Sequence, residues 1–318
     1  MQRVVKRLFE QSDNHWQLFI VDDASTYEPA VDYLQHLQRA CPEHIQLQCL
    51  PTQMGPGACR NLGIRMAERE GCPVVMFCDS DDLVHRERVQ ITRRHFSEAV
   101  TPTVLYSSFT AVDGHGFKVP MHKVTPSLLE ILEATRPVAP QGHDVWKQIA
   151  TQTGYLNLTS STSVSMNTAL RHPFPLESVS EDSHTWMRYS ASGARFVFDP
   201  TIPVSYRVKV GAGSASRERD AGLFYAEKVR VDTDGFNIAL QMGVASGSVQ
   251  GHTESNHLRA MFQLRLAATM AREQQQQLAI DALDLACQSQ METTLAGIKQ
   301  FPELLSLLGL VQSMNRAA

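Results

Sequence analysis

Residues 74–82 read Val74-Val75-Met76-Phe77-Cys78-Asp79-Ser80-Asp81-Asp82, and they decide how the surrounding sequence is interpreted. Five apolar residues after Pro73 predict a short strand buried on both faces. Three carboxylates then follow within four positions, at the end of the strand where ligands bind in open α/β sheets. Clustered carboxylates repel one another unless a cation lies among them. The alternative is a polar turn in which Asp82 caps the next helix.

Strands and helices are expected to alternate on both sides of this stretch. Strands are expected at residues 16–21, 45–50 and 74–78, and helices at 2–12, 28–40, 58–69 and 84–99. Such alternation is typical of a parallel sheet covered by helices on both faces. Further strands are expected at 103–109, 195–199 and 203–207, and helices at 125–135, 143–152 and 182–192. Ser25 or Thr26 is expected to cap the helix at 28–40.

Composition describes an ordinary folded protein of 318 residues, with 43% hydrophobic and 19% charged residues. A net charge of −4 gives no electrostatic reason to expect nucleic acid as a partner. Six cysteines without a CxxC pair favour free thiols in a reducing compartment. No apolar run reaches the roughly 20 residues of a membrane span. We therefore expect a cytoplasmic protein with no transmembrane segment.

Four other motifs accompany the acidic strand end. In chain order they are Asp22-Asp23-Ala24-Ser25, Cys59-Arg60-Asn61-Leu62-Gly63, Ser180-Glu181-Asp182 and Tyr206-Arg207. Over about residues 10–216 this order resembles the inverting family 2 glycosyltransferases with a GT-A fold. Each motif alone is weak, because acidic strand ends are common, whereas five in the right order are specific. The resemblance implies an α/β fold with a GT-A-like, mostly parallel sheet sandwiched by helices.

The resemblance also implies a nucleoside-diphosphate-sugar donor and a divalent cation, Mn²⁺ or Mg²⁺. Asp81, with Asp79 or Asp82 alongside, resembles the metal site, and Asp79 is also expected to meet the donor ribose. Hard oxygen ligands suit these cations, which stabilise charge on a departing diphosphate. Donor-binding roles are likewise implied for four residues: Asp22 or Asp23 at the base or ribose, Arg60 at a base carbonyl or phosphate, and Arg207 near a segment that closes over the diphosphate. For Arg60, the alternative is an ordinary surface arginine.

Asp182 is the candidate general base, with Glu181 beside it or exchanging roles with it. In a single inverting displacement, a carboxylate opposite the nucleotide takes the proton of the attacking acceptor hydroxyl. The alternative makes Glu181-Asp182 a helix N-cap, which is compatible with catalysis because capping also fixes a base. We therefore expect an inverting hexosyltransferase. The acceptor stays open among a saccharide, a lipid-linked molecule and a small molecule.

The sequence departs from the family pattern at its start, where the usual first strand is lacking. Met1 falls where the helix after that strand would begin, and the loss is expected to expose backbone groups on two neighbouring strands. Either the start is truncated, or another segment fills the slot, or donor binding is lost. The last case keeps a catalytically inactive GT-A-like partner-binding module as the alternative function. A sugar nucleotidyltransferase is disfavoured, because no Gly-rich phosphate loop is found near the start.

Residues 1–216 are expected to form the glycosyltransferase domain and residues 217–318 a mainly helical region. From Ser255 onward the sequence is Gln-rich and carries no strand pattern. Residues 301–311 are apolar enough for peripheral membrane or subunit contact, although core packing is the favoured role. The oligomeric state stays open.

Overall fold

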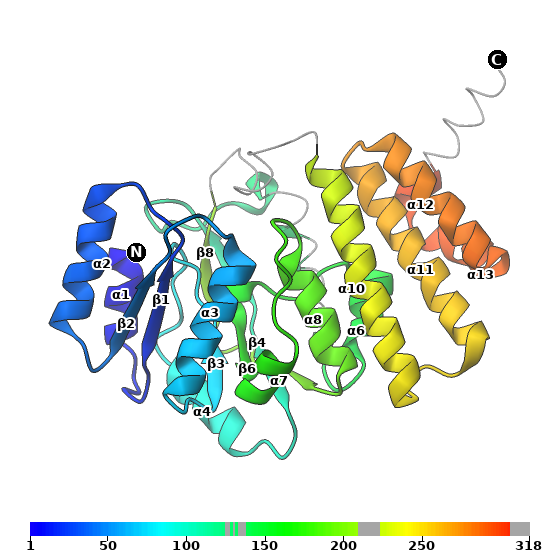
Figure 1. The fold of residues 1–318 in the computed structure, drawn as a ribbon. Helices are drawn as coiled ribbons and strands as arrows, with labels where there is room; N and C mark the ends of the chain where they lie inside the picture. Colours follow the sequence, from blue (N-terminus) through cyan, green and yellow to red (C-terminus); the bar gives the residue numbers. More distant parts are fainter. Residues whose placement is uncertain (125–127, 130, 133–137, 209–222, 306–318) are drawn as a thin grey trace.

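The computed structural model describes the whole chain except residues 125–127, 130, 133–137, 209–222 and 306–318. Most of the expected helix at 125–135, most of the segment after Arg207 and the end of the 301–311 stretch therefore lie outside the described residues; residues 128–129 and 131–132 of the expected helix are described and are helical. The described part is an α/β domain that continues into a mainly helical region, as predicted (Figure 1). No helix in the described ranges combines the length and apolar character needed to cross a bilayer.

The expected alternation of helix and strand is confirmed in the first hundred residues. The elements are α1 (Gln2–Phe9), β1 (Leu18–Asp22), α2 (Glu28–Ala40), β2 (Ile45–Cys49), α3 (Pro56–Arg69), β3 (Val74–Met76) and α4 (Arg88–Ser97). Pro56 begins α3, where the missing N–H costs nothing and the fixed φ favours the helix. The expected cap of α2 is wrong: its N-cap is Tyr27, with no side-chain bond, and a proline lies in its first turn.

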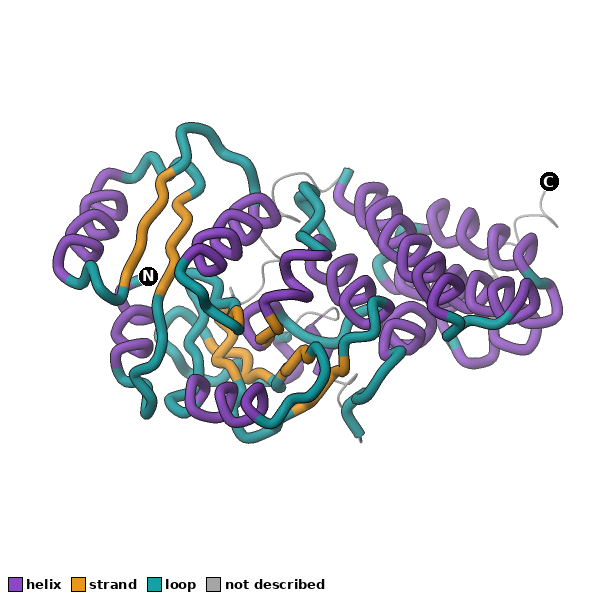
Figure 2. The backbone as a smooth tube through the Cα atoms, turned by 60° about the horizontal axis from the view of Figure 1, so that its bottom comes forward, coloured by secondary structure: helices purple, strands orange, loops and turns teal. Residues whose placement is uncertain are grey.

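The later strands complete three separate sheets. They are β4 (Thr103–Tyr106), β5 (Phe109–Val112), β6 (Thr162–Ser165), β7 (Arg195–Phe198) and β8 (Val204–Arg207). Strand β1 pairs with β2 in parallel, β5 pairs with β8 in parallel, and the third sheet has the order β3-β6-β4-β7. Figure 2 shows the β1–β2 pair standing apart from the central strands. Of the five strand pairings within the described residues, three are parallel, which confirms the mostly parallel sheet.

The strand at residues 74–78 differs from its prediction. Regular pairing ends at Met76, and β3 is half-buried and lies at the end of its sheet. Its partner β6 comes from more than eighty residues later and runs antiparallel to both β3 and β4. Periodicity cannot show this, because it reports which faces are apolar and not which segment pairs with which.

Strands β1 and β3 are not joined by any backbone hydrogen bond in the described part of the chain. On β1, the backbone groups of Phe19 and Val21 point away from β2, because the even-numbered residues bond to that strand. On β3, those of Val74 and Met76 point away from β6, because the odd-numbered residues make those bonds. On both strands, these backbone groups face the interruption between β1 and β3.

Short helices connect the strands, and long helices follow them. The short ones are η1 (Met121–Lys123), α6 (Val145–Gln148), the π-helical η2 (Ile149–Thr153), η3 (Thr159–Ser161) and α7 (Met166–Arg171), and α8 spans Glu181–Ala191. The C-terminal region contains α10 (Phe224–Ser246), α11 (Gly251–Arg272), α12 (Gln276–Ser289), α13 (Met291–Gly297) and η4 (Ile298–Gln300).

Helix α10 packs closely against α8, which joins the helical region to the domain. A Cβ built on Gly235 would lie 2.9 Å from the backbone of His184, so only glycine permits this approach. The Phe236 and Phe262 rings stack with centroids 4.2 Å apart, linking α10 to α11. One continuous core therefore contains Trp186 of α8 together with these phenylalanines.

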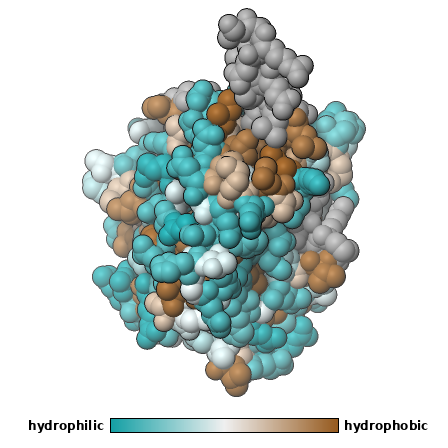
Figure 3. Space-filling model, turned by 90° about the vertical axis from the view of Figure 1, so that its right-hand side faces the viewer, coloured by the Kyte–Doolittle hydropathy of each residue, from teal (hydrophilic) through white to brown (hydrophobic). Residues whose placement is uncertain are grey.

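The surface seen in Figure 3 is mostly hydrophilic, with several apolar side chains gathered in its upper part. The exposed large apolar residues of α12, α13 and the chain that follows are Leu285, Met291, Leu295 and Leu305. Leu304 is fully buried, which agrees with the core packing favoured for the start of the 301–311 stretch.

Candidate active site

A cavity of about 1040 Å³ lies between β1, β3, the start of α3, the start of α8 and α10. Seven of the nine candidate residues line it: Asp23, Arg60, Asp79, Asp81, Glu181, Asp182 and Arg207. Asp22 and Asp82 do not. The remaining wall is largely apolar and includes residues of β1 and β3 that face the interruption between the two strands. Motifs separated by more than a hundred residues thus meet in one place.

Arg60, in the second turn of α3, connects two of the acidic motifs. Its Nη1 donates to Glu181 Oε1 at 2.6 Å, and its Nη2 donates to Asp79 Oδ1 at 3.1 Å. The guanidinium also lies 5.3 Å from the centre of the Phe174 ring, within cation–π range. Despite its burial, these carboxylates raise the pKa of Arg60 above its ordinary value. The surface-arginine alternative is wrong, since only 15% of its side chain is exposed.

The three aspartates after β3 lie in different surroundings. The backbone N–H of Asp79 donates to Ser160 Oγ, and Asp81 is exposed at the cavity wall. Asp82 is fully buried instead, and its Oδ1 accepts a hydrogen bond from the backbone N–H of Arg207. Burial raises the pKa of Asp82 to about 7. Among the described residues, no group lies in hydrogen-bonding geometry to Asp82 Oδ2.

This arrangement offers few ligands for a cation. In the described part of the chain, no three His, Cys, Asp or Glu side chains converge as a metal site. Asp79 and Asp81 both face the cavity, and only one Asp79 oxygen is engaged, by Arg60. Two carboxylates fit Mg²⁺ or a similar cation that takes its other ligands from phosphate oxygens and water. The residues present therefore fit a cation bound together with a ligand.

The acidic pair after β1 is largely committed to backbone groups. Asp22 is 9% exposed and accepts a hydrogen bond from the N–H of Ser25. The two oxygens of Asp23 accept from the N–H groups of Met54 and Gly55, at 2.6 and 2.9 Å. These bonds fix the loop that leads into α3, and hence the position of Arg60.

Glu181 and Asp182 lie in the first turn of α8, where the helix dipole favours negative charge. The expectation that they cap the helix is wrong, because the N-cap is Ser180, which has a left-handed φ of 55°. Asp182 Oδ1 accepts from the N–H of Ser183 at 2.7 Å. Burial, followed by the Glu181 charge, raises the pKa of Asp182 to about 7, against the opposing effect of Arg60 and Lys228. A carboxyl with this pKa exchanges protons near neutral pH.

Two residues that the sequence interpretation missed also line the cavity, namely Tyr155 and Lys228. Lys228 comes from α10, a region without an assigned motif, and its Nζ donates to Tyr155 Oη at 3.0 Å. The available signal was Lys228 four residues before Asp232, an i,i+4 charged pair with Val229 and Val231 between its members. Tyr155 lies in a loop and had no sequence signal.

Comparison with known proteins finds one matching family model, one curated relative and similar solved structures. The model of glycosyl transferase family 2 matches residues 1–152. An uncharacterized glycosyltransferase of Rickettsia conorii is 28% identical over 95 residues, which is 30% of this chain and 14% of that protein. The chain therefore aligns with only a small part of this curated relative.

Two solved structures are similar at low identity. GalNAc-T7 with UDP, GalNAc and Mn²⁺ aligns at 12% identity and a TM-score of 0.45, over 72% of this chain and 44% of that chain. A mannosyltransferase from Pyrobaculum calidifontis with GDP-Man and Mn²⁺ aligns at 13% identity and a TM-score of 0.46, over 93% and 82% of the two chains.

Proposed function

We propose that the chain, whose residues 1–152 match the model of glycosyl transferase family 2, is an inverting hexosyltransferase. It moves a sugar from a nucleoside diphosphate to the hydroxyl of a saccharide, lipid-linked or small-molecule acceptor. The observation that supports this most is the meeting of the β3 carboxylates and the α8 carboxylates in one cavity, connected by Arg60. We also propose residue 216 as the end of the glycosyltransferase domain.

Asp182 is proposed to act as the general base. Its first-turn position on α8 places a largely desolvated carboxyl at the cavity, and a pKa near the working pH suits a base that must accept and release a proton. Glu181 is proposed to support Asp182 through its ion pair with Arg60. Because Glu181 stays paired, the neighbouring Asp182 is the better candidate to take the acceptor proton.

Asp79 and Asp81 are proposed to hold Mn²⁺ or Mg²⁺ at the cavity wall. Such a cation supplies stabilisation of the charge that develops on a departing diphosphate. A role for Asp82 as a third metal ligand remains a prediction. In the structure its Oδ1 accepts a hydrogen bond from the backbone N–H of Arg207, and its carboxyl does not line the cavity. Through that bond, Asp82 also fixes the position of Arg207 in the structure.

Donor binding is proposed for Asp22, Asp23, Arg60, Asp79 and Arg207. Arg60 and Arg207 supply positive charge to a cavity wall that also carries several carboxylates, which suits a diphosphate. Asp22 and Asp23 are proposed to border the base or ribose, although their carboxyl oxygens already accept backbone hydrogen bonds. Asp79 has one oxygen left for a ribose hydroxyl or the cation.

The experiment that tests this function is calorimetric titration of UDP, GDP, ADP and CDP, each with and without Mn²⁺. We expect one of them to bind, and to bind more tightly with Mn²⁺, together with slow hydrolysis of the corresponding sugar nucleotide. Absence of both binding and hydrolysis would contradict the proposal. It would favour the second candidate, an inactive partner-binding module, for which the interruption between β1 and β3 is the specific structural argument.

A further inference from the structure

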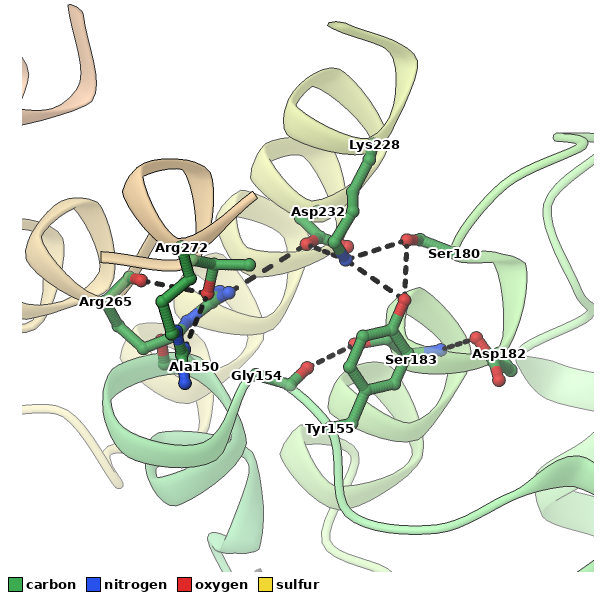
Figure 4. Close-up of polar contacts among 11 residues, drawn as sticks. Ala150, Gly154, Tyr155, Ser180, Asp182, Ser183, Lys228, Asp232, Arg265 and Arg272 are labelled. Atoms are coloured by element: carbon green, nitrogen blue, oxygen red, sulfur yellow. Dashed lines mark hydrogen bonds and ion pairs between the residues drawn. The ribbon is translucent and has the colours of Figure 1, made fainter. Parts of the chain in front are cut away.

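A buried polar cluster lies directly behind the start of α8 and includes side chains from the C-terminal helices (Figure 4). Lys228 Nζ donates to Tyr155 Oη at 3.0 Å, to Ser180 Oγ at 3.3 Å and to Asp232 Oδ2 at 2.9 Å. Tyr155 Oη and Ser180 Oγ are themselves 3.0 Å apart. The ammonium thus makes three hydrogen bonds, its full donor capacity.

The charges in this cluster are almost completely removed from water. The Lys228 side chain is 7% exposed and that of Asp232 is 1% exposed. Arg265 of α11 also approaches Asp232, with its Nη1 atom 4.0 Å from Asp232 Oδ2. Burying the Lys228–Asp232 ion pair costs desolvation free energy that apolar residues of similar size would avoid. This cost suggests that the pair has a role other than stabilising the fold.

The cluster acts on the residue immediately before the two catalytic candidates. Ser180 is the N-cap of α8 and has a left-handed backbone, which non-glycine residues adopt only when their surroundings hold them there. The described contacts that hold its side chain are those with Tyr155 and Lys228. Moving Ser180 would change the direction in which the first turn of α8 presents Glu181 and Asp182.

We propose that Lys228 is a positioning residue for the base, connecting the C-terminal helical region to the active site through Tyr155 and Ser180. This inference rests on the proposed function of Asp182. Lys228 orders the start of α8, and its charge favours the ionised Asp182 carboxylate that accepts a proton. The helical region therefore contributes a residue to the cavity wall and is needed for transfer.

The electrostatic surroundings of Asp182 agree with this role. The groups that face it are Glu181 on the same helix, Arg60 of α3, Lys228 of α10, and the hydroxyls of Tyr155 and Tyr206. Burial and Glu181 raise the pKa of Asp182, whereas Arg60 and Lys228 lower it. Removing the Lys228 charge is therefore expected to raise that pKa further and to shift the acidic limb of kcat to higher pH.

The test compares Lys228→Met and Tyr155→Phe with the control Lys147→Met. Lys147 is another half-buried lysine that connects the domain to the helical region, through Glu254 at 2.8 Å and the Ser248 carbonyl, but it does not line the cavity. We expect Lys228→Met to lower kcat about 100-fold and Tyr155→Phe about 10-fold, because small displacements of a reacting group are costly. Donor affinity should change less than about threefold, and Lys147→Met should keep wild-type kcat.

Two further readouts separate the possible failures. A thermal melt of each variant shows whether it folds. If Lys228→Met does not fold, Tyr155→Phe decides, since it removes only a hydroxyl. Wild-type kcat and an unshifted pH profile in the folded variants, with Asp182→Asn inactive, would overturn the role of Lys228 and leave the proposed function intact. A wild-type protein that binds no donor would instead refute the proposed function.

Discussion

The two acidic edges of the cavity differ in their contact with water, and the difference separates their proposed tasks. After β3, Asp81 is exposed and the Asp79 side chain is 40% exposed. At the start of α8, Asp182 is half-buried, and burial together with the Glu181 charge raises the pKa of its carboxyl to about 7. A cation site needs carboxylates that stay ionised, whereas a base must change its protonation state during turnover. Arg60 bonds to both edges and keeps their spacing.

The largest expected effect comes from removing the base. Asp182→Asn preserves shape and the bond from Ser183 but cannot accept the acceptor proton. We expect kcat to fall about 1000-fold, within the range for lost general-base catalysis, with donor affinity near wild type. Glu177→Gln is the matched control, because Glu177 pairs with Arg230 on the surface and is absent from the cavity wall. Retained turnover in Asp182→Asn would show that the α8 edge does not supply the general base, and the proposed division of tasks between the two edges would be wrong.

The next largest effect concerns the exposed edge. Asp81→Asn should weaken Mn²⁺-dependent binding of the nucleoside diphosphate about 10- to 100-fold, because one charged oxygen ligand is lost. Binding measured without metal should be little changed. Titration calorimetry with and without Mn²⁺ measures the two binding affinities separately. Glu68→Gln is the control, because Glu68 is an exposed acidic residue on α3. Equal loss under both conditions would place Asp81 at the donor and not at a cation.

Breaking the connection between the edges should reduce stability as well as activity. Arg60→Met leaves Glu181 beside Asp182 without its ion-pair partner. We expect a loss of about 2 kcal/mol in the free energy of unfolding, below the value for a fully buried pair because Asp79 is partly exposed. Urea denaturation measures it, with Arg65→Met as the control, since Arg65 pairs with Glu68 in solvent. An unchanged midpoint would mean that Arg60 does not hold the edges together.

The smallest effect is a dependence of stability on pH. Burial raises the pKa of Asp82 and of Asp182 from 3.8 to about 7 in the folded state. Between these values the folded protein binds more protons than the unfolded chain, so stability falls as pH rises from about 4 to 7. Asp82→Asn should reduce this slope and stabilise the protein at pH 8, because the buried side chain at position 82 then no longer has to ionise.

Thermal melts of wild type and Asp82→Asn between pH 5 and 8 provide the measurement. Identical pH slopes would show that Asp82 ionises as readily in the folded protein as in the unfolded chain. That result would contradict the burial of Asp82, which distinguishes it from the exposed Asp81.

Much of the site was predictable because acidic residues at strand and helix ends carry a local signal. The positions of Asp79, Asp81, Glu181 and Asp182 at such ends follow from apolar periodicity and its interruption, and each lines the cavity. Asp82 was predicted alongside Asp81 at the metal site, and the structure shows that the two differ in burial, since adjacent residues at a strand end point in different directions. Sequence spacing gives no measure of this difference in burial.

The sequence by itself determined the α/β alternation, the helical C-terminal region and the motifs of the cavity. These follow from local periodicity and residue chemistry, which depend on neighbours a few positions away. Only the tertiary structure decided that β6 lies antiparallel between β3 and β4, that β1 and β3 are not joined, and that Lys228 stands behind Ser180. Those facts depend on contacts between segments tens of residues apart, whose pairing is set by the packing of the whole chain.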